Sequence, residues 1–292
     1  AMHSFQSSSQ LRCGDRLLDL RKPQVMAIIN VTPDSFSDGG KYHAGSALLD
    51  KILAQVDLAC AEGAGLIDIG GESTRPGAAP VSEAEECQRV LPVVEAIAQR
   101  FDVAISVDTS NATVMRESAV LGAALINDVR ALQQPNALQE AAASGLPVCL
   151  MHMRGDPVSM QNNPEYQDIC GEVEVFLRAR VAACVAAGIS QDQIVLDPGF
   201  GFAKNLAHNL ELFRRLPEIV AWGYPVLVGV SRKSMIGALT GRTVAERLAG
   251  SVAMAAMAVE RGAHIIRAHD VKETVDAVRI AQALKFEKIE NV

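Results

Sequence analysis

The 292-residue sequence predicts an α/β protein with the architecture of a (β/α)8 TIM barrel. Eight short apolar runs alternate with stretches of helical periodicity. Each run is continuously aliphatic, as in parallel strands that are covered on both faces. Each run also ends in, or just before, a polar residue. A doubly wound open sheet is the alternative, because it has the same alternation of strands and helices.

Three of the eight strands are predicted by a repeated pattern. Each copy has Gly-Ala where a helix would end, one small or variable residue, two large aliphatics, and then a polar residue. The polar residues are Asp68, Asn127 and Arg267, so each falls at the carboxyl end of its strand. The copies are EGAGLIDIGG (62–71), LGAALINDVR (121–130) and RGAHIIRAHD (261–270).

Five further aliphatic runs complete the predicted barrel. They are Val25–Asn30, Val103–Asp108, Pro147–His152, Ile194–Asp197 and Pro225–Val230. We see no linker and no break in composition, so we expect one domain over residues 1–292, with residues 1–10 as a flexible N-terminal segment.

Helices are predicted between these runs. Residues 46–62 carry aliphatic side chains on one face. Ser82 with Glu85, and Thr243 with Glu246, have the spacing of capping boxes. An acidic start at Asp270 predicts a last helix that runs to about residue 286.

Composition limits the function. Hydrophobic residues make up 49% and charged residues 21%, and the formal net charge is −7. We therefore expect neither nucleic-acid nor membrane binding, and without an apolar leader we expect a cytoplasmic protein. The six cysteines form no C-x-x-C pair, which favours reduced core thiols, with a disulfide framework or zinc site as the alternative.

The polar residues at the strand ends fall into two chemical groups. Asp108, Asn127 and Asp197 offer acceptors and an amide, which suit a flat heterocycle with several N–H donors. The second group is cationic and suits an anion such as phosphate. It comprises Arg75, Lys233, Arg267 and His269.

Two loops extend this interpretation. NVTPDSFSDGG (30–40) and GGESTRPGAAP (70–80) follow the first two strands and are too long for tight turns. Loops of this composition can close over a ligand, although a plain surface loop has the same composition. His152 is equally well interpreted as a packed residue or a functional one. We expect Lys233 to face inward and Arg232 to support the rim.

Several motifs in order make the sequence similar to a known family. These are NVTPDSFSDGG, GGESTRPG, SVDTS, INDVR, CLMHM, LDPGFGF, VGVSRKSMIG and RAHD, between about residues 10 and 285. Together they resemble the dihydropteroate synthase family. The resemblance implies a transferase that joins 6-hydroxymethyl-7,8-dihydropterin diphosphate to p-aminobenzoate in folate biosynthesis, with Mg²⁺ assisting. It also implies a homodimer; an apolar helix at Val244–Val259 is compatible with that, and equally with burial inside a monomer.

The resemblance also implies roles for individual residues. Those that would hold the pterin are Asp108, Asn127, Asp197 and Lys233. Those near the diphosphate are Asn30, which would also be near the metal, Thr74, Arg75, Arg267 and His269. The p-aminobenzoate environment, also the sulfonamide-binding region, would be Thr32, Pro33, Phe36, Phe202 and Ser234. The residues expected to take part in catalysis are Lys233, Arg267, His269 and Asp108.

Two positions depart from the family pattern, and two other functions stay open. Asn111 stands where a lysine is common, and Ala203 stands where the motif usually has glycine; we expect a weaker surface or anion contact and a stiffer turn. A pterin-binding methyltransferase barrel is one alternative function, although it needs no diphosphate cluster. A catalytically silent pterin- or phosphate-binding barrel is the other.

Overall fold

The computed structural model describes residues 10–31, 45–73, 78–155 and 165–285. Eight parallel strands form the barrel, as the aliphatic runs predict. They are β3 (Gln24–Asn30), β4 (Leu66–Gly70), β5 (Ala104–Asp108), β6 (Leu125–Asp128), β7 (Val148–Met151), β8 (Ile194–Asp197), β9 (Leu227–Gly229) and β10 (Ile265–Ala268).

The pairing order shows a barrel rather than an open sheet. Strands β3 to β8 pair in sequence order, and β9 and β10 return to β3. A parallel bridge between Leu196 and Val226, with the Leu196 N–H donating to the Pro225 carbonyl at 2.9 Å, joins β8 to the segment that leads into β9. The eight carboxyl ends therefore form one ring.

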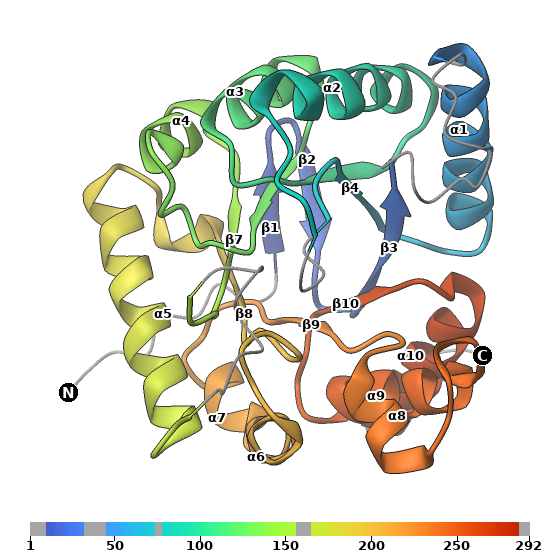
Figure 1. Cartoon of the computed structure of the whole chain (residues 1–292), viewed down its shortest axis with the longest axis vertical. Helices are drawn as coiled ribbons and strands as arrows, with labels where there is room; N and C mark the ends of the chain where they lie inside the picture. Colours follow the sequence, from blue (N-terminus) through green and yellow to red (C-terminus); the bar gives the residue numbers. More distant parts are fainter. Residues whose placement is uncertain (1–9, 32–44, 74–77, 156–164, 286–292) are drawn as a thin grey trace.

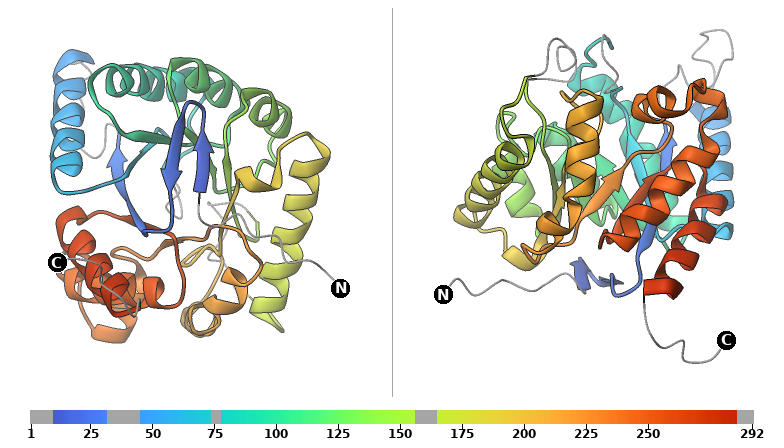
Figure 2. Two further views of the ribbon diagram at one scale, coloured as in Figure 1. Left: turned by 180° about the vertical axis from the view of Figure 1, so that it is seen from behind. Right: turned by 90° about the horizontal axis from the view of Figure 1, so that it is seen from below.

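Helices surround the strands (Figures 1 and 2). They are α1 (Gly45–Ala61), α2 (Glu83–Arg100), α3 (Ala112–Leu121), α4 (Ala137–Ser144), α5 (Ile169–Ala186), α6 (Leu206–Arg214), α7 (Leu216–Val220), α8 (Ser234–Thr240), α9 (Leu248–Glu260) and α10 (Val271–Lys285), with 3-10 turns η2 (Gln191–Gln193) and η3 (Val244–Glu246). Their apolar faces and the outward-facing strand residues form the main core.

An N-terminal hairpin that the sequence did not predict covers the amino end of the barrel. Strands β1 (Gln10–Cys13) and β2 (Arg16–Asp19) pair antiparallel, and Figure 1 shows them across the middle of the ring. Leu11, fully buried, belongs to a second apolar cluster together with inward residues of the barrel strands such as Met26 and Leu66. Gln10, which we expected to be flexible, begins β1. Residues 1–9 lie outside the described part of the chain.

Three local predictions differ from the structure. Ser82 accepts the Glu85 N–H at 3.2 Å, which is one half of a capping box. Thr243 and Glu246 do form a complete box, but it opens a single 3-10 turn. The helix expected over Val244–Val259 therefore begins as η3 and restarts as α9 after Arg247. The six cysteines are free, as expected of reduced thiols.

Candidate active site

Arg267 links two carboxylates at the carboxyl end of the barrel. Its Nε donates to Asp68 Oδ2 at 2.8 Å, and its Nη2 lies 3.5 Å from Asp108 Oδ2. The three side chains come from β10, β4 and β5, which are separated by up to 199 positions in sequence. The barrel thus brings together one residue from the predicted anion group and one from the predicted heterocycle group.

Asp68 is the buried member of this cluster and contacts Arg267 and Asn127. It is 1% exposed, and its Oδ1 accepts the Ser106 hydroxyl at 2.8 Å and the Asn127 amide at 3.5 Å. Sequence reasoning noted Asp68 at a strand end but gave it no role. Its contacts with Arg267 and Asn127 indicate that it orients two of the predicted site residues.

The carboxyl groups of Asp108 and Asp197 have raised pKa values. Burial and the nearby charge of Asp68 raise the pKa of Asp108 well above its ordinary value, against the opposing effect of Arg267. Burial also raises the pKa of Asp197, with Lys233 acting in the opposite direction. Both groups would gain from a ligand that donates N–H bonds to their ionised forms.

Lys233 and Arg232, adjacent in sequence, diverge in the structure. Lys233 Nζ donates to the Phe200 carbonyl at 2.5 Å and lies 4.8 Å from the centroid of the Phe202 ring. Burial lowers the pKa of Lys233 to about 8. Arg232 instead pairs with Asp270 at 2.9 Å. The two side chains thus have different surroundings, Lys233 beside the Phe200–Phe202 segment and Arg232 beside Asp270, and Arg232 has a left-handed φ of 57°.

His269 is held by Ser231. The serine hydroxyl lies 2.8 Å from the ring nitrogen Nδ1 of His269 and accepts the backbone N–H of the same residue at 3.1 Å. Although His269 reaches solvent, desolvation of the ring and the neighbouring cations Arg232 and Arg267 lower its pKa to about 4. The lowered pKa favours a neutral imidazole at His269, so its proposed place beside the diphosphate would depend on hydrogen bonding as well as on charge.

His152 is a packed residue that partners Lys204, a lysine without a predicted role. His152 is 3% exposed and its Nδ1 lies 2.9 Å from Lys204 Nζ. Burial and then the positive charge of Lys204 lower the pKa of His152 to about 2. The packed interpretation of His152 is thus supported. The LDPGFGF motif ends two residues before Lys204, so it was the sequence signal that could have pointed to Lys204 as the partner of His152.

A second polar cluster supports the β5 and β6 ends. Thr109 donates to Glu86 at 2.5 Å, and Ser110 donates to Asp128 at 2.5 Å. Burial raises the pKa of Glu86 to about 6. Arg130 donates to Ser110 at 2.9 Å and pairs with Glu72 at 3.0 Å. This cluster ties α2 and the loop after β4 to the strands that carry Asp108 and Asn127.

Of the remaining predicted residues, two are described. Phe202 is part-buried, next to Lys233, whereas Ser234 is exposed at the first position of α8. Five of the others lie outside the described residues. They are Thr32, Pro33, Phe36, Thr74 and Arg75. For Asn30, at the end of β3, the structure describes only the backbone.

The two departures from the family pattern have local explanations. Asn111 caps α3, accepting the N–H groups of Thr113 at 2.8 Å and Val114 at 3.1 Å. Ala203 has a left-handed φ of 53°, the conformation that favours glycine. Neither substitution changes a polar group in the Arg267 cluster.

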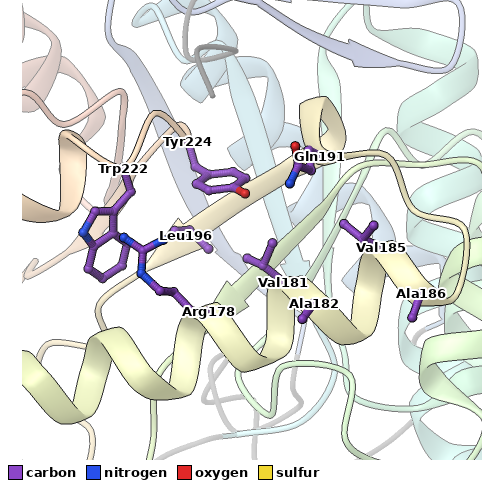
Figure 3. A pocket seen from close by; sticks show the side chains of 9 residues that line it. All are labelled: Arg178, Val181, Ala182, Val185, Ala186, Gln191, Leu196, Trp222 and Tyr224. Carbon is purple, nitrogen blue, oxygen red and sulfur yellow. The ribbon is translucent and has the colours of Figure 1, made fainter. Parts of the chain in front are cut away.

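One cavity of the described chain lies outside the barrel. It holds about 460 Å³ and separates α5 from the segment that follows α7. Figure 3 shows the Trp222 ring beside the Arg178 guanidinium, which lies 4.8 Å from the ring centroid. None of the predicted site residues lines this cavity.

The described part of the chain contains no group of three or more His, Cys, Asp or Glu side chains arranged to hold a metal ion. Over the same residues, no helix combines the length and the apolarity that crossing a bilayer requires.

Comparison with known proteins places these features in context. The model of the family described as pterin binding enzyme matches residues 26–269. Dihydropteroate synthase of Escherichia coli (strain K12) is 57% identical over 266 residues, which are 91% of this chain and 93% of that protein. The Haemophilus influenzae dihydropteroate synthase is 52% identical over 94% of this chain and 98% of its own.

Solved structures agree with these relatives. A crystal structure of Yersinia pestis dihydropteroate synthase with a sulfonamide drug superposes with a TM-score of 0.89 at 55% identity, covering 94% of this chain and 99% of that one. A Xanthomonas albilineans dihydropteroate synthase with 4-aminobenzoic acid has a TM-score of 0.88 at 46% identity, covering 95% of this chain and 98% of the other. The chain is thus similar to these enzymes over nearly its whole length.

Proposed function

Because this chain belongs to the pterin binding enzyme family, and within it to the dihydropteroate synthases, we propose that the carboxyl-end cluster around Arg267 carries out their reaction. The enzyme condenses 6-hydroxymethyl-7,8-dihydropterin diphosphate with p-aminobenzoate, yielding 7,8-dihydropteroate and pyrophosphate in folate biosynthesis. The observation that carries the assignment of the site is the convergence of Asp68, Asp108 and Arg267 from three distant strands onto one point.

The pterin ring would be held by the carboxylate half of the mouth. The N–H donors of its guanidine-like edge match Asp197, and further ring nitrogens match Asp108 and Asn127. The raised pKa values of the two carboxylates support this role, because ligand N–H donors would relieve the unfavourable burial of their charges. Lys233, within reach of the same region, would lie against the ring.

The diphosphate would leave from the opposite half of the mouth. The C–O bond of the pterin CH2 group breaks, and its electron pair departs with the diphosphate, where preplaced donors stabilise the growing charge. Arg267 supplies a guanidinium and a neutral His269 would donate from Nε2. That tautomer is supported by Ser231, which can direct its hydroxyl proton to Nδ1. Asn30, Thr74 and Arg75 remain proposed partners.

The carbon–nitrogen bond forms in the second half of the reaction. An electron-rich dihydropterin can carry positive charge on the CH2 carbon, so we assign a dissociative, SN1-like path with Asp108 and Asp197 stabilising the ring. The neutral aromatic amine attacks this carbon and loses one proton, and no strong base is required. Phe202 and Ser234, with Thr32, Pro33 and Phe36, form the proposed p-aminobenzoate and sulfonamide environment.

Magnesium fits the site only as a companion of the substrate. The described residues offer no cage of His, Cys or acidic side chains. Mg²⁺ commonly keeps several waters and is held by one or two protein oxygens together with substrate phosphates. Asn30, at the carboxyl end of β3, is the proposed protein ligand. When bound, the ion would supply Lewis-acid stabilisation of the leaving diphosphate.

The surface around α8, η3 and α9 supports a homodimer. Leu239, Val244, Leu248 and Met257 are large apolar residues that are 42–58% exposed. An apolar surface shared by neighbouring elements favours association. Light scattering should give twice the 31.1 kDa of one chain, and Met257→Glu should shift the protein toward the monomer.

Pyrophosphate release tests the proposed reaction. The purified protein should release pyrophosphate when given both substrates, with dihydropteroate formed in equal amount. Omission of p-aminobenzoate should stop formation of dihydropteroate. Absence of product with both substrates and magnesium present would refute the reaction, whereas a normal rate in an Arg267→Ala variant would refute only the proposed site.

A further inference from the structure

Lys204 is a buried lysine whose amine is fully used in hydrogen bonds. It is 3% exposed, and its Nζ lies 2.9 Å from each of the Gly199 carbonyl, the Phe202 carbonyl and His152 Nδ1. An ammonium has three N–H donors, which match these three near acceptors, and the His152 carbonyl lies farther away at 3.5 Å. When Lys204 is protonated, His152 accepts at Nδ1 and carries its own proton on Nε2.

The backbone around this amine leaves little freedom to rearrange. Gly199 has a φ of +78°, and a Cβ built there would lie 2.0 Å from the His152 carbonyl oxygen and 3.2 Å from Lys204 Nζ. Ala203, one residue before the lysine, also has a left-handed φ. The turn from Gly199 to Lys204 is therefore closed around the ammonium.

The same turn joins the two proposed substrate regions. It begins after Asp197, whose carboxylate accepts the Gly199 N–H at 2.9 Å. In the same turn, the Phe200 carbonyl accepts a hydrogen bond from Lys233 Nζ, and the Phe202 ring lies beside that Lys233 ammonium. Lys204 thus fixes the backbone on both sides of the segment that carries Phe202, without itself reaching the mouth.

The charge of Lys204 is costly where it lies. Burial lowers its pKa to about 7, against the opposing charge of Asp197, and the hydrogen-bond partners of its amine among the described residues are backbone carbonyls and an imidazole rather than a carboxylate. A buried charge of this kind persists where its hydrogen bonds define a geometry, since an apolar side chain of similar volume would be easier to bury. The acceptors it holds are those of the turn beneath Phe202.

We propose that Lys204 is a positioning residue for p-aminobenzoate, which fixes the Phe202 turn through the Gly199 and Phe202 carbonyls with neutral His152 as its third partner. The inference rests on the proposed function, because it assigns the aromatic amine to the Phe202 side of the mouth. Lys204 would touch neither substrate. Its substitution would nevertheless affect the binding of p-aminobenzoate more than the binding of the pterin diphosphate.

Lys204→Met tests the proposal most directly. We expect KM for p-aminobenzoate to rise about 10-fold or more, because small displacements of a positioning group have large kinetic effects, while KM for the pterin diphosphate stays within about 2-fold. Arg180→Met is the matched control. Arg180 also donates to two loop carbonyls, those of Ala131 and Leu132, but that loop carries no proposed site residue, so both KM values should be unchanged.

A pair of His152 variants keeps the test decisive if Lys204→Met does not fold. His152→Asn retains an acceptor near the position of Nδ1, whereas His152→Leu removes it. We expect KM for p-aminobenzoate near the unsubstituted value in the first and raised about 3- to 10-fold in the second, at equal pterin KM. Equal p-aminobenzoate KM values in both variants, or parallel losses for both substrates, would overturn the proposal. Failure of the unsubstituted protein to form dihydropteroate would instead refute the proposed function.

Discussion

The two ends of one barrel differ in almost every chemical respect. At the amino end, the hairpin β1–β2 seals a layer of apolar side chains that includes fully buried Leu11, Met26 and Leu66. At the carboxyl end, the same strands present Asp68, Asp108 and Arg267. The difference indicates that the amino end adds to the folding free energy supplied by the main core, whereas the carboxyl end carries the chemistry, so substitutions at the two ends should separate stability from activity.

Asp197→Ala should produce the largest loss at the carboxyl end. Two hydrogen bonds to a charged group contribute about 3–6 kcal/mol, so pterin affinity should fall at least about 100-fold. Stability near pH 7 should hold or rise, because a carboxyl whose folded-state pKa is raised destabilises the native state once it ionises. Calorimetry and urea unfolding measure the two quantities, and native pterin affinity would refute the role of Asp197.

Leu11→Ala should show the opposite pattern at the amino end. Removing this buried side chain should lower the free energy of unfolding by about 2–5 kcal/mol while kcat stays unchanged well below the melting temperature. Leu17→Ala is the matched control on the same hairpin, since Leu17 is 48% exposed and should cost under about 0.5 kcal/mol. A kcat that fell with stability would contradict the separation of the two ends.

Arg267→Ala and His269→Ala should each reduce kcat on the order of 10²-fold, about 2.7 kcal/mol, by weakening stabilisation of the departing diphosphate. Arg261→Ala provides the control, because Arg261 follows α9 and precedes β10 at the amino end. Steady-state assays of pyrophosphate release measure the effect. Unchanged rates in either mouth variant would count against its assignment.

The smallest expected effect is the release of protons when the pterin binds. Because the pKa values of Asp108 and Asp197 are raised, part of their population is protonated as pH falls, and a ligand that donates N–H bonds selects the ionised forms. Pterin binding should therefore release up to about one proton, and affinity should decrease as pH is lowered. Calorimetry in buffers of different ionisation enthalpy detects this, and a buffer-independent heat would exclude it.

The sequence predicted the barrel because its signals are local. Each aliphatic run and its terminal polar residue can be read without knowing the partners, and the motif order identified the family. Strand ends were less accurate: the run expected over Pro225–Val230 is strand only at Leu227–Gly229, since the rest lies where β8 and β9 barely pair.

What could not be predicted depends on three-dimensional neighbours. The hairpin β1–β2 has only four residues in each strand. It is stabilised by packing against the apolar side chains at the amino end of the barrel. The lowered pKa of His269 follows from desolvation of its ring and then from the nearby charges of Arg232 and Arg267. Lys204 is one cation among 27 in the sequence, and only its three acceptors distinguish it.

A crystal structure of the protein with dihydropterin diphosphate and magnesium tests the central claim most directly. The account predicts the pterin ring within hydrogen-bond distance of Asp108, Asn127 and Asp197, with the diphosphate against Arg267 and His269. A ring bound elsewhere, for example in the outer cavity beside Trp222, or a diphosphate that meets neither cationic residue, would contradict it.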